Sequence, residues 1–153
     1  MYRTLGVPGA YLIWALLFVV LSGVVFESLV VVRGRFPFYL LWTVSFLAYA
    51  VAWMLAYFVL GRTVGEWVGS LAGSVLMAIV LAAGFRSLNS TLKVSAVLFV
   101  ANALGYFLGA ALLDSYASQT GMLLFGVVYG LFFGAGIGAA LHMVQQPSNE
   151  QAT

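Results

Sequence analysis

Three polar residues stand within otherwise apolar stretches of this sequence, and they are its best candidates for chemistry: Glu27, Asn102 and His142. A carboxylate, an amide and an imidazole can bind a cation, relay a proton or hydrogen-bond a solute. Ionisable groups inside a membrane span are costly, and they generally face the interior of a helix bundle or a watery cavity. We therefore predict that these residues form a solute or proton site.

Each of the three also has a purely structural interpretation. Glu27 either binds a proton or cation, or pairs with Arg86, Lys93 or a loop arginine at the same membrane depth. His142 either relays protons or binds a ligand headgroup, or it lies at the interface near a helix C-terminus, where the dipole favours it. For Asn102, a hydrogen bond to a neighbouring helix is favoured over a polar path, because a buried amide must find partners in lipid.

Composition excludes several classes of protein. The chain has 153 residues, of which 64% are hydrophobic and only 7% charged, whereas soluble domains carry ~25% charged residues. With no cysteine and one histidine, disulfide scaffolds, thiolate sites and His-rich metal centres are excluded. The net charge of +2 is too small for a nucleic-acid footprint. We therefore expect no catalytic, cofactor-binding or metal-binding residues, and no enzyme.

The elements that position the polar residues are long apolar stretches. Spanning ~30 Å of hydrocarbon takes about 20 apolar residues, and five such stretches fit the sequence, at roughly 9–32, 37–60, 64–85, 92–113 and 121–144. The links between them are short, and the tail 145–153 is polar. The sequence predicts one all-α membrane domain over 1–153, a bundle of five transmembrane helices with short loops.

Small residues recur at a spacing of four in the last three of these stretches. Residues four apart lie on one face of a helix, and small residues there let a second helix approach closely. We predict that spans three to five form the tight core, held by these helix-packing glycines: Gly65, Gly69 and Gly73; Gly105 and Gly109; and Gly126, Gly130, Gly134 and Gly138, a ridge that His142 continues.

The second stretch carries aromatic residues at spacings of three and four, which place them along one stripe: Tyr39, Trp42, Phe46, Tyr49, Trp53 and Tyr57. Such a stripe is typical of helix packing combined with an interfacial aromatic belt. It is also suited to gripping a flat apolar ligand such as a quinone or a carotenoid. The sequence leaves both interpretations open.

Lysine and arginine are distributed unevenly between the two ends of the predicted bundle. One end holds four basic residues in its loops, at 33, 35, 86 and 93, and the other holds two, at 3 and 62. The positive-inside rule then predicts an outside N-terminus and a cytoplasmic C-terminus. Compactness and short loops suggest a bacterial inner membrane.

One short segment resembles a known family. The run from Asn102 to Phe107 is similar to the N-x-x-G-x-F segment in a pore helix of the small bacterial fluoride channels. The likeness covers only those residues, Gly109 comes one place early for that family, and its F-S-T-F segment is absent. We therefore carry no function across.

The leading functional hypothesis is a small transporter or channel-like protein for a small solute or ion, possibly oligomeric. It rests on the three polar residues distributed through apolar spans. The alternatives are a non-catalytic membrane subunit that packs against a larger partner through its glycine ridges, and a binder of an apolar cofactor or lipid. The expected partners are the lipid bilayer and either further copies of the chain or a partner membrane subunit.

Overall fold

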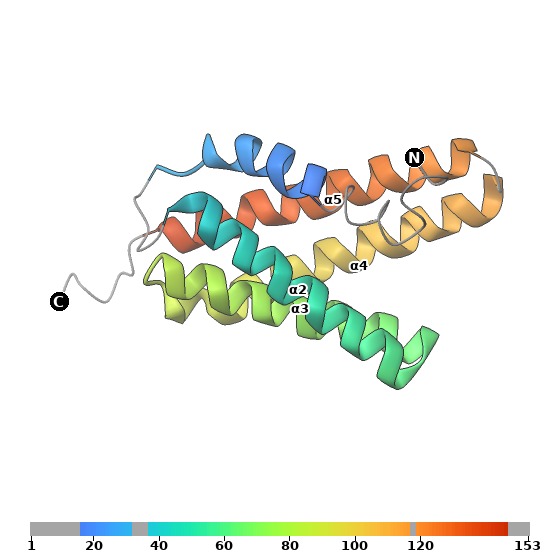
Figure 1. Ribbon diagram of the computed structural model, residues 1–153, viewed down its shortest axis with the longest axis horizontal. Coiled ribbons are helices and arrows are strands. Elements are labelled where there is room, and N and C mark those ends of the chain that lie inside the picture. The colour runs from blue at the N-terminus through green and yellow to red at the C-terminus, as the bar shows by residue number, and fades with distance from the viewer. Residues whose placement is uncertain (1–15, 32–36, 117–118, 147–153) are drawn as a thin grey trace.

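The protein is described by a computed structural model that covers residues 16–31, 37–116 and 119–146. These residues form helices and connecting turns without a strand, so the predicted all-α class is confirmed. The elements, shown in Figure 1, are a short helix Leu16–Glu27, then α2 (Phe38–Leu60), α3 (Arg62–Gly84), the 3-10 turn η1 (Leu88–Ser90), α4 (Thr91–Tyr116) and α5 (Gln119–Gln145).

Four of these helices, α2 to α5, are long and apolar enough to cross a membrane. Their bounds agree within a few residues with the four predicted spans that begin at 37, 64, 92 and 121. The described part of the first helix, Leu16–Glu27, covers about 18 Å at 1.5 Å per residue. The rest of the predicted span 9–32 falls on a turn after Glu27 and on residues outside the described ranges.

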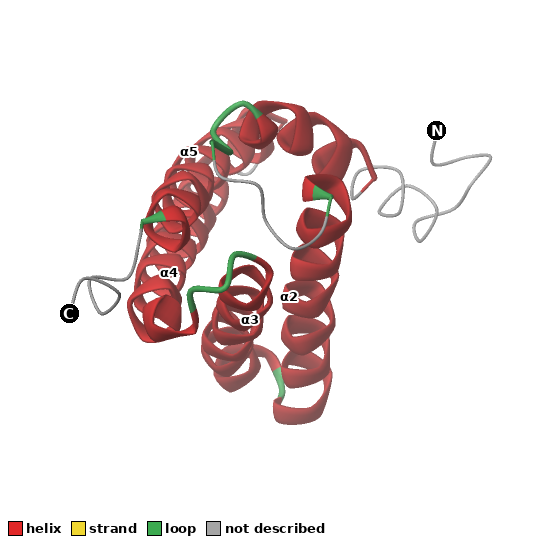
Figure 2. Ribbon diagram, turned by 90° about the vertical axis from the view of Figure 1, so that its left-hand side faces the viewer, coloured by secondary structure: helices red, strands yellow, loops and turns green. Residues whose placement is uncertain are grey.

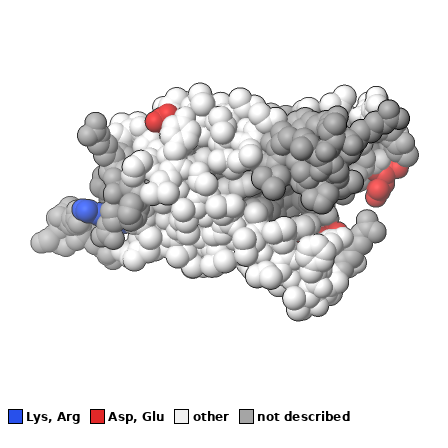
Figure 3. All heavy atoms as spheres, in the orientation of Figure 1, with Lys and Arg blue, Asp and Glu red and all other residues white. Residues whose placement is uncertain are grey.

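The outside of the bundle is apolar. Large hydrophobic side chains are exposed along every helix, among them Leu55, Phe58, Leu92, Leu123 and Leu131. The face in Figure 3 is almost uncharged, and the charged atoms visible on it lie toward the two ends of the molecule. In water, a continuous apolar surface of this kind would drive association. It is the surface expected of a helix bundle in lipid.

The four long helices pack as two hairpins, α2 with α3 and α4 with α5, and α3 lies against α4 (Figure 2). The prediction that spans three to five form the core is therefore wrong, because α3 makes its closest contacts with α2. A Cβ added at Gly65 would lie 2.6 Å from the Cα of Tyr57, and one at Gly73 would lie 2.7 Å from the ring of Tyr49. Gly69 approaches α2 in the same way.

The glycines of α4 also pack closely, in this case against α5. A Cβ added at Gly105 would lie 3.2 Å from the carbonyl oxygen of Tyr129, and one at Gly109 would lie 2.9 Å from the ring of Phe125. In both hairpins, the missing side chain lets one helix backbone rest on its neighbour. The glycines of α3 and α4 thus lie where their helices come closest to a neighbour, in line with the packing role predicted for them.

The glycine ridge of α5 behaves differently. Among the described residues, nothing lies within 4 Å of a Cβ added at Gly126, Gly130 or Gly134, and Gly138 makes only an ordinary contact with Leu29 at 3.8 Å. The prediction that this ridge packs against another helix is therefore wrong within the described part of one chain.

The reason lies in a second series with the same period. Phe125, Tyr129 and Phe133 each come one residue before a glycine of the ridge, so they are rotated from it by about 100°. They stack on one another, with ring centroids 5.8 Å apart for the first pair and 5.5 Å for the second. Because the aromatic series faces the bundle, the glycines are turned outward.

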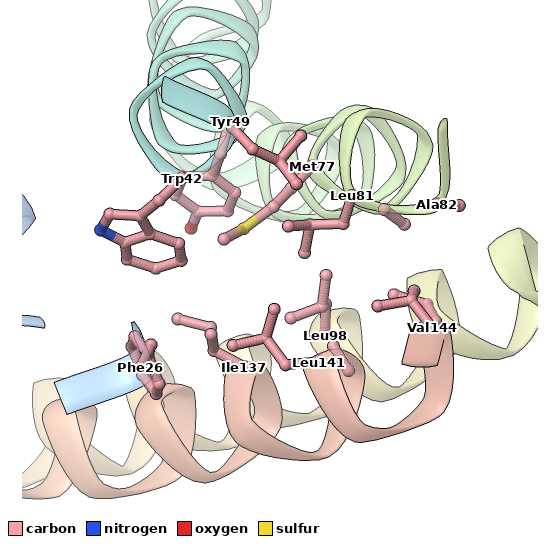
Figure 4. Close-up of a cluster of buried hydrophobic side chains, with 14 of the residues drawn as sticks. Phe26, Trp42, Tyr49, Met77, Leu81, Ala82, Leu98, Ile137, Leu141 and Val144 are labelled. Carbon is pink, nitrogen blue, oxygen red and sulfur yellow. The ribbon is translucent and has the colours of Figure 1, made fainter. Parts of the chain in front are cut away.

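The hydrophobic core lies at the end of the bundle where α3 joins α4. All helices contribute to it, and Figure 4 shows its members meeting between the two hairpins, among them Phe26, Trp42, Met77, Leu81, Leu98, Ile137 and Leu141. Toward the opposite end the α2–α3 and α4–α5 hairpins diverge (Figure 1). The bundle is thus closed at one end and forked at the other.

The short helix is fastened to the closed end by hydrogen bonds to α2 and α5. The indole Nε1 of Trp42 donates to the carbonyl of Val19 at 3.1 Å. The amide of Gln145 donates to the carbonyl of Leu29 at 3.2 Å and accepts from the backbone N–H of Val31 at 2.7 Å. These bonds hold the short helix and the turn that follows it beside α5.

Candidate functional site

The three polar residues predicted to form a site are not brought together. Glu27 is exposed at the end of the short helix, and its carboxylate accepts a hydrogen bond from Tyr39. His142 is exposed near the end of α5, where its Nε2 lies 3.0 Å from the side-chain nitrogen of Gln146. Asn102 is only 1% exposed, in the interior of α4.

Helix geometry shows how far apart these places are. Tyr39, the partner of Glu27, precedes Tyr49, a partner of Asn102, by ten positions on α2, which is about 15 Å along the axis. His142 follows Tyr129, the other partner of Asn102, by 13 positions on α5, which is about 20 Å. The described structure therefore offers no shared cavity for the three side chains.

Of the partners predicted for Glu27, the loop arginines at 33 and 35 lie outside the described residues. Its hydrogen-bond partner in the described part of the chain is the hydroxyl of Tyr39, and neither Arg86 nor Lys93 pairs with it there. Tyr39 also packs on Gly23, since a Cβ added at that glycine would lie 2.9 Å from its ring. The carboxylate thus lies at the junction of the short helix and α2.

Asn102 makes the hydrogen bonds to neighbouring helices that were favoured for it. Its Oδ1 accepts from the hydroxyl of Tyr49 on α2 at 2.7 Å and from that of Tyr129 on α5 at 3.0 Å. The two hydroxyl oxygens lie 3.5 Å apart. We refer to Tyr49, Asn102 and Tyr129 as the polar triad. It joins three helices at the point where the two hairpins begin to diverge.

One polar group of the triad has no partner in the described part of the chain. The Nδ2 of Asn102 is buried and forms no hydrogen bond there. A buried donor left unsatisfied costs about 1–3 kcal/mol. An amide has nearly the same shape with its oxygen and nitrogen exchanged, so its orientation follows from the surrounding hydrogen bonds. The exchanged amide would donate from Nδ2 to both tyrosine hydroxyls.

A pocket opens beside the triad, in the fork between the hairpins. Its volume is about 420 Å³, and eight of its ten lining residues are aromatic. They come from the short helix, α2, α4 and α5: Phe18, Phe46, Tyr49, Ala50, Trp53, Met54, Tyr106, Phe125, Tyr129 and Phe133. The pocket lies in the size range of small-molecule sites. We call it the aromatic pocket.

The walls of the aromatic pocket are fixed by ring contacts between helices. The ring of Tyr49 lies 5.2 Å from that of Phe133, and Trp53 meets Tyr106 edge-on at 6.3 Å. Both distances fall in the range of favourable aromatic pairs. Met54, at the rim, is 48% exposed, so the pocket is reached from the apolar surface of the bundle.

One wall of this pocket was visible in the sequence. The aromatic stripe of the second span contributes Phe46, Tyr49 and Trp53. The contribution of α5 was not predicted, because its glycines and the aromatic residues that precede them have the same spacing of four, and spacing alone does not say which series faces the bundle. The signal that could have found it is the triplet Phe125, Tyr129 and Phe133, which has the same spacing as the stripe on α2.

Comparison with known proteins gives no relative. No protein-family model matches the chain, and no curated protein or solved structure matches it significantly. The function has to be argued from the site itself.

The chemistry that this site supports is recognition rather than bond making. Aromatic rings can stack on a flat apolar molecule, and two hydroxyls held by one amide can orient a polar atom on that molecule. In the described part of the chain, histidine and acidic residues form no cluster of three that could hold a metal ion.

Proposed function

We propose that this protein is a membrane-embedded binding protein for a flat, largely apolar ligand. The observation that carries the proposal is the aromatic pocket of about 420 Å³, with the polar triad at its side. It corresponds to the sequence hypothesis of a binder of an apolar cofactor or lipid. The pocket uses the aromatic stripe on which that hypothesis rested.

The arrangement of the pocket supports lateral entry from the bilayer. The fork between the hairpins opens among lipid-facing side chains such as Met54. A ligand dissolved in the hydrocarbon therefore reaches the rings without crossing a polar barrier. Its transfer from lipid yields little hydrophobic energy, since acyl chains are as apolar as the pocket. Ring stacking and hydrogen bonding must supply the selectivity.

Transport stays a prediction that the geometry supports less. A solute path needs polar groups in succession, whereas Glu27, Asn102 and His142 lie at separate places in the described structure. A path that uses Glu27 requires that Glu27→Gln abolish solute flux in proteoliposomes. We expect this variant to leave any flux unchanged, because the exposed carboxylate bonds Tyr39 and lies outside the aromatic pocket.

The subunit hypothesis also stays a prediction, with one observation in its favour. Gly126, Gly130 and Gly134 are free of contacts within the described part of the chain, and a smooth glycine face is suited to close helix packing in lipid. A second copy of the chain or a partner membrane subunit would fit there. This contact and the aromatic pocket lie on different faces of α5, so the two functions are compatible.

The binding function is tested with 1,4-naphthoquinone, a flat apolar quencher of tryptophan fluorescence, titrated into the full chain in dodecyl maltoside. We expect saturable quenching that is lost in Trp53→Phe, which removes the reporter in the pocket wall. It should also be lost in Ala50→Phe, which fills the pocket. Trp67→Phe and Val51→Phe are the matched controls, because both positions lie outside the pocket and are about half exposed.

Two results would contradict the proposal. One is quenching that rises linearly with the quinone in the micelle and never saturates. The other is saturation that survives Ala50→Phe unchanged. Helical circular dichroism and elution volume, compared across the four variants, show whether each retains its fold.

A further inference from the structure

We infer that the ligand of the aromatic pocket carries a hydrogen-bond acceptor of the ketone or quinone class, to which at least one of the hydroxyls of Tyr49 and Tyr129 donates. This inference rests on the proposed binding function and adds the chemical class of the ligand. It follows from the hydrogen bonds of the polar triad.

The side-chain amide of Asn102 can take two orientations, which differ in the number of polar groups that find a partner. As placed, its Oδ1 accepts from both tyrosine hydroxyls, and the two N–H groups of its Nδ2 have no partner in a side chain that is 1% exposed. With oxygen and nitrogen exchanged, each N–H donates to one hydroxyl oxygen. Only the amide oxygen of Asn102 is then without a hydrogen-bond partner. Buried N–H groups without partners are rarer in proteins than under-satisfied carbonyls. The exchanged arrangement is therefore the better satisfied one.

The hydroxyls of Tyr49 and Tyr129 each carry one proton that can be donated. In the exchanged arrangement, neither tyrosine donates to Asn102, so two hydroxyl protons are available. The hydroxyl oxygens are 3.5 Å apart, so at most one proton is used between them. At least one O–H donor remains, on a residue that lines the pocket. A buried donor favours an acceptor on the ligand.

The hydroxyl donor and the aromatic rings that line the pocket together define the kind of ligand that fits. The rings of Trp53, Phe125 and Phe133 line the same pocket, and they favour a flat ring system. A carbonyl attached to a ring system meets both requirements. The opposite amide orientation would use both hydroxyl protons internally and would select a ligand that donates, such as a phenol. The class of ligand therefore depends on a single amide rotation.

The experiment compares two ligands of nearly identical shape, 1-tetralone with a carbonyl and tetralin without one. Each displaces 1,4-naphthoquinone from the full chain, read as recovery of Trp53 fluorescence and calibrated separately in each variant. Tyr49→Phe and Tyr129→Phe retain the rings and remove the donors. Tyr57→Phe removes a hydroxyl from the same face of α2 outside the pocket and is the matched control.

We expect the affinity for 1-tetralone to fall about fivefold to tenfold in at least one of the two pocket variants, the effect of one net hydrogen bond. The affinity for tetralin should stay unchanged, and Tyr57→Phe should change neither. Partition into the micelle cancels, because each ligand is compared between wild type and variant. In the wild type, the carbonyl stretch of bound 1-tetralone should shift to lower frequency, a readout that needs no variant to fold.

Three results would overturn the inference. If 1-tetralone keeps its affinity in both pocket variants and its carbonyl band does not shift, the ligand class is wrong while the binding function stands. If 5,6,7,8-tetrahydro-1-naphthol is preferred over 1-tetralone, Asn102 holds the opposite orientation and the site selects donors. If naphthoquinone quenching never saturates in the wild type, the binding function fails together with the inference.

Discussion

Replacing a single glycine by alanine on α3 should weaken the protein, whereas the same replacement on α5 should not. At Gly65 the added Cβ would lie 2.6 Å from the Cα of Tyr57 and 2.7 Å from the carbonyl oxygen of Ala56. Both are backbone atoms, which cannot rotate away. At Gly130 the added Cβ meets nothing within 4 Å among the described residues. The difference in unfolding free energy between Gly65→Ala and Gly130→Ala therefore measures the effect of close helix packing alone.

The size of the effect follows from the overlap. Ordinary contacts of a Cβ begin near 3.4 Å, so α2 and α3 must separate by somewhat less than 1 Å around Gly65. A gap of 0.5–1 Å forfeits a quarter to a half of each contact of ~0.1–0.2 kcal/mol, which over a few tens of atom pairs amounts to ~1–3 kcal/mol. Overpacked sites lose a similar amount. Alanine also has a higher helix propensity than glycine, by up to ~1 kcal/mol, and comparison with Gly130→Ala corrects for that.

The assay is reversible unfolding in mixed micelles of dodecyl maltoside and sodium dodecyl sulfate, followed by far-UV circular dichroism. We expect Gly65→Ala to lower the free energy of unfolding by about 1–3 kcal/mol. Gly130→Ala should leave it the same or raise it slightly. The oligomeric state is recorded for each variant by light scattering.

The reasoning fails if Gly65→Ala is neutral, because α2 and α3 would then not be in backbone contact. It also fails if Gly130→Ala destabilises a monomer as strongly as Gly65→Ala does. A third outcome is that Gly130→Ala loses stability and also dissociates from an oligomer to a monomer. It would show that the α5 glycine face contacts a second chain, as the subunit hypothesis predicts.

Three further perturbations test the triad and the short helix. Asn102→Leu leaves two tyrosine hydroxyls without their buried partner and should lower the free energy of unfolding by about 1–3 kcal/mol in the same mixed-micelle titration; a neutral result would show that the triad is not formed. Trp42→Phe removes the hydrogen bond to the carbonyl of Val19, so amide hydrogen exchange in the short helix should accelerate while exchange in α4 stays unchanged. Gln145→Ala removes the bonds to Leu29 and to the turn that follows the short helix, so exchange should accelerate at that turn, and equal acceleration throughout α5 would contradict this role.

Much of the fold was predictable from local patterns. The four long helices could be placed because each is a run of apolar residues of the length that a bilayer needs. The close approach of the α3 and α4 glycines to neighbouring helices was also foreshadowed by their spacing of four, which places small residues on one face of a helix. On α5 two such series lie side by side, and the prediction selected the wrong one.

The candidate site was only partly predictable. Asn102 stood out as a buried amide in an apolar span, and its bonding to other helices followed from that. Its partners did not, since Tyr49 and Tyr129 are 80 positions apart in the sequence and meet only through the packing of two hairpins. Glu27 and His142 stood out equally in the sequence, yet they lie outside the pocket.

The sequence by itself determined that this chain forms helices for a membrane, because hydrophobic length and charge content are properties of each segment alone. Tertiary structure decided which face of α5 points inward and where the two hairpins diverge. Rotating a helix by one residue, about 100°, exchanges a glycine face for an aromatic face at no local cost. Only the contacts with neighbouring helices separate the two choices, and those contacts also create the aromatic pocket.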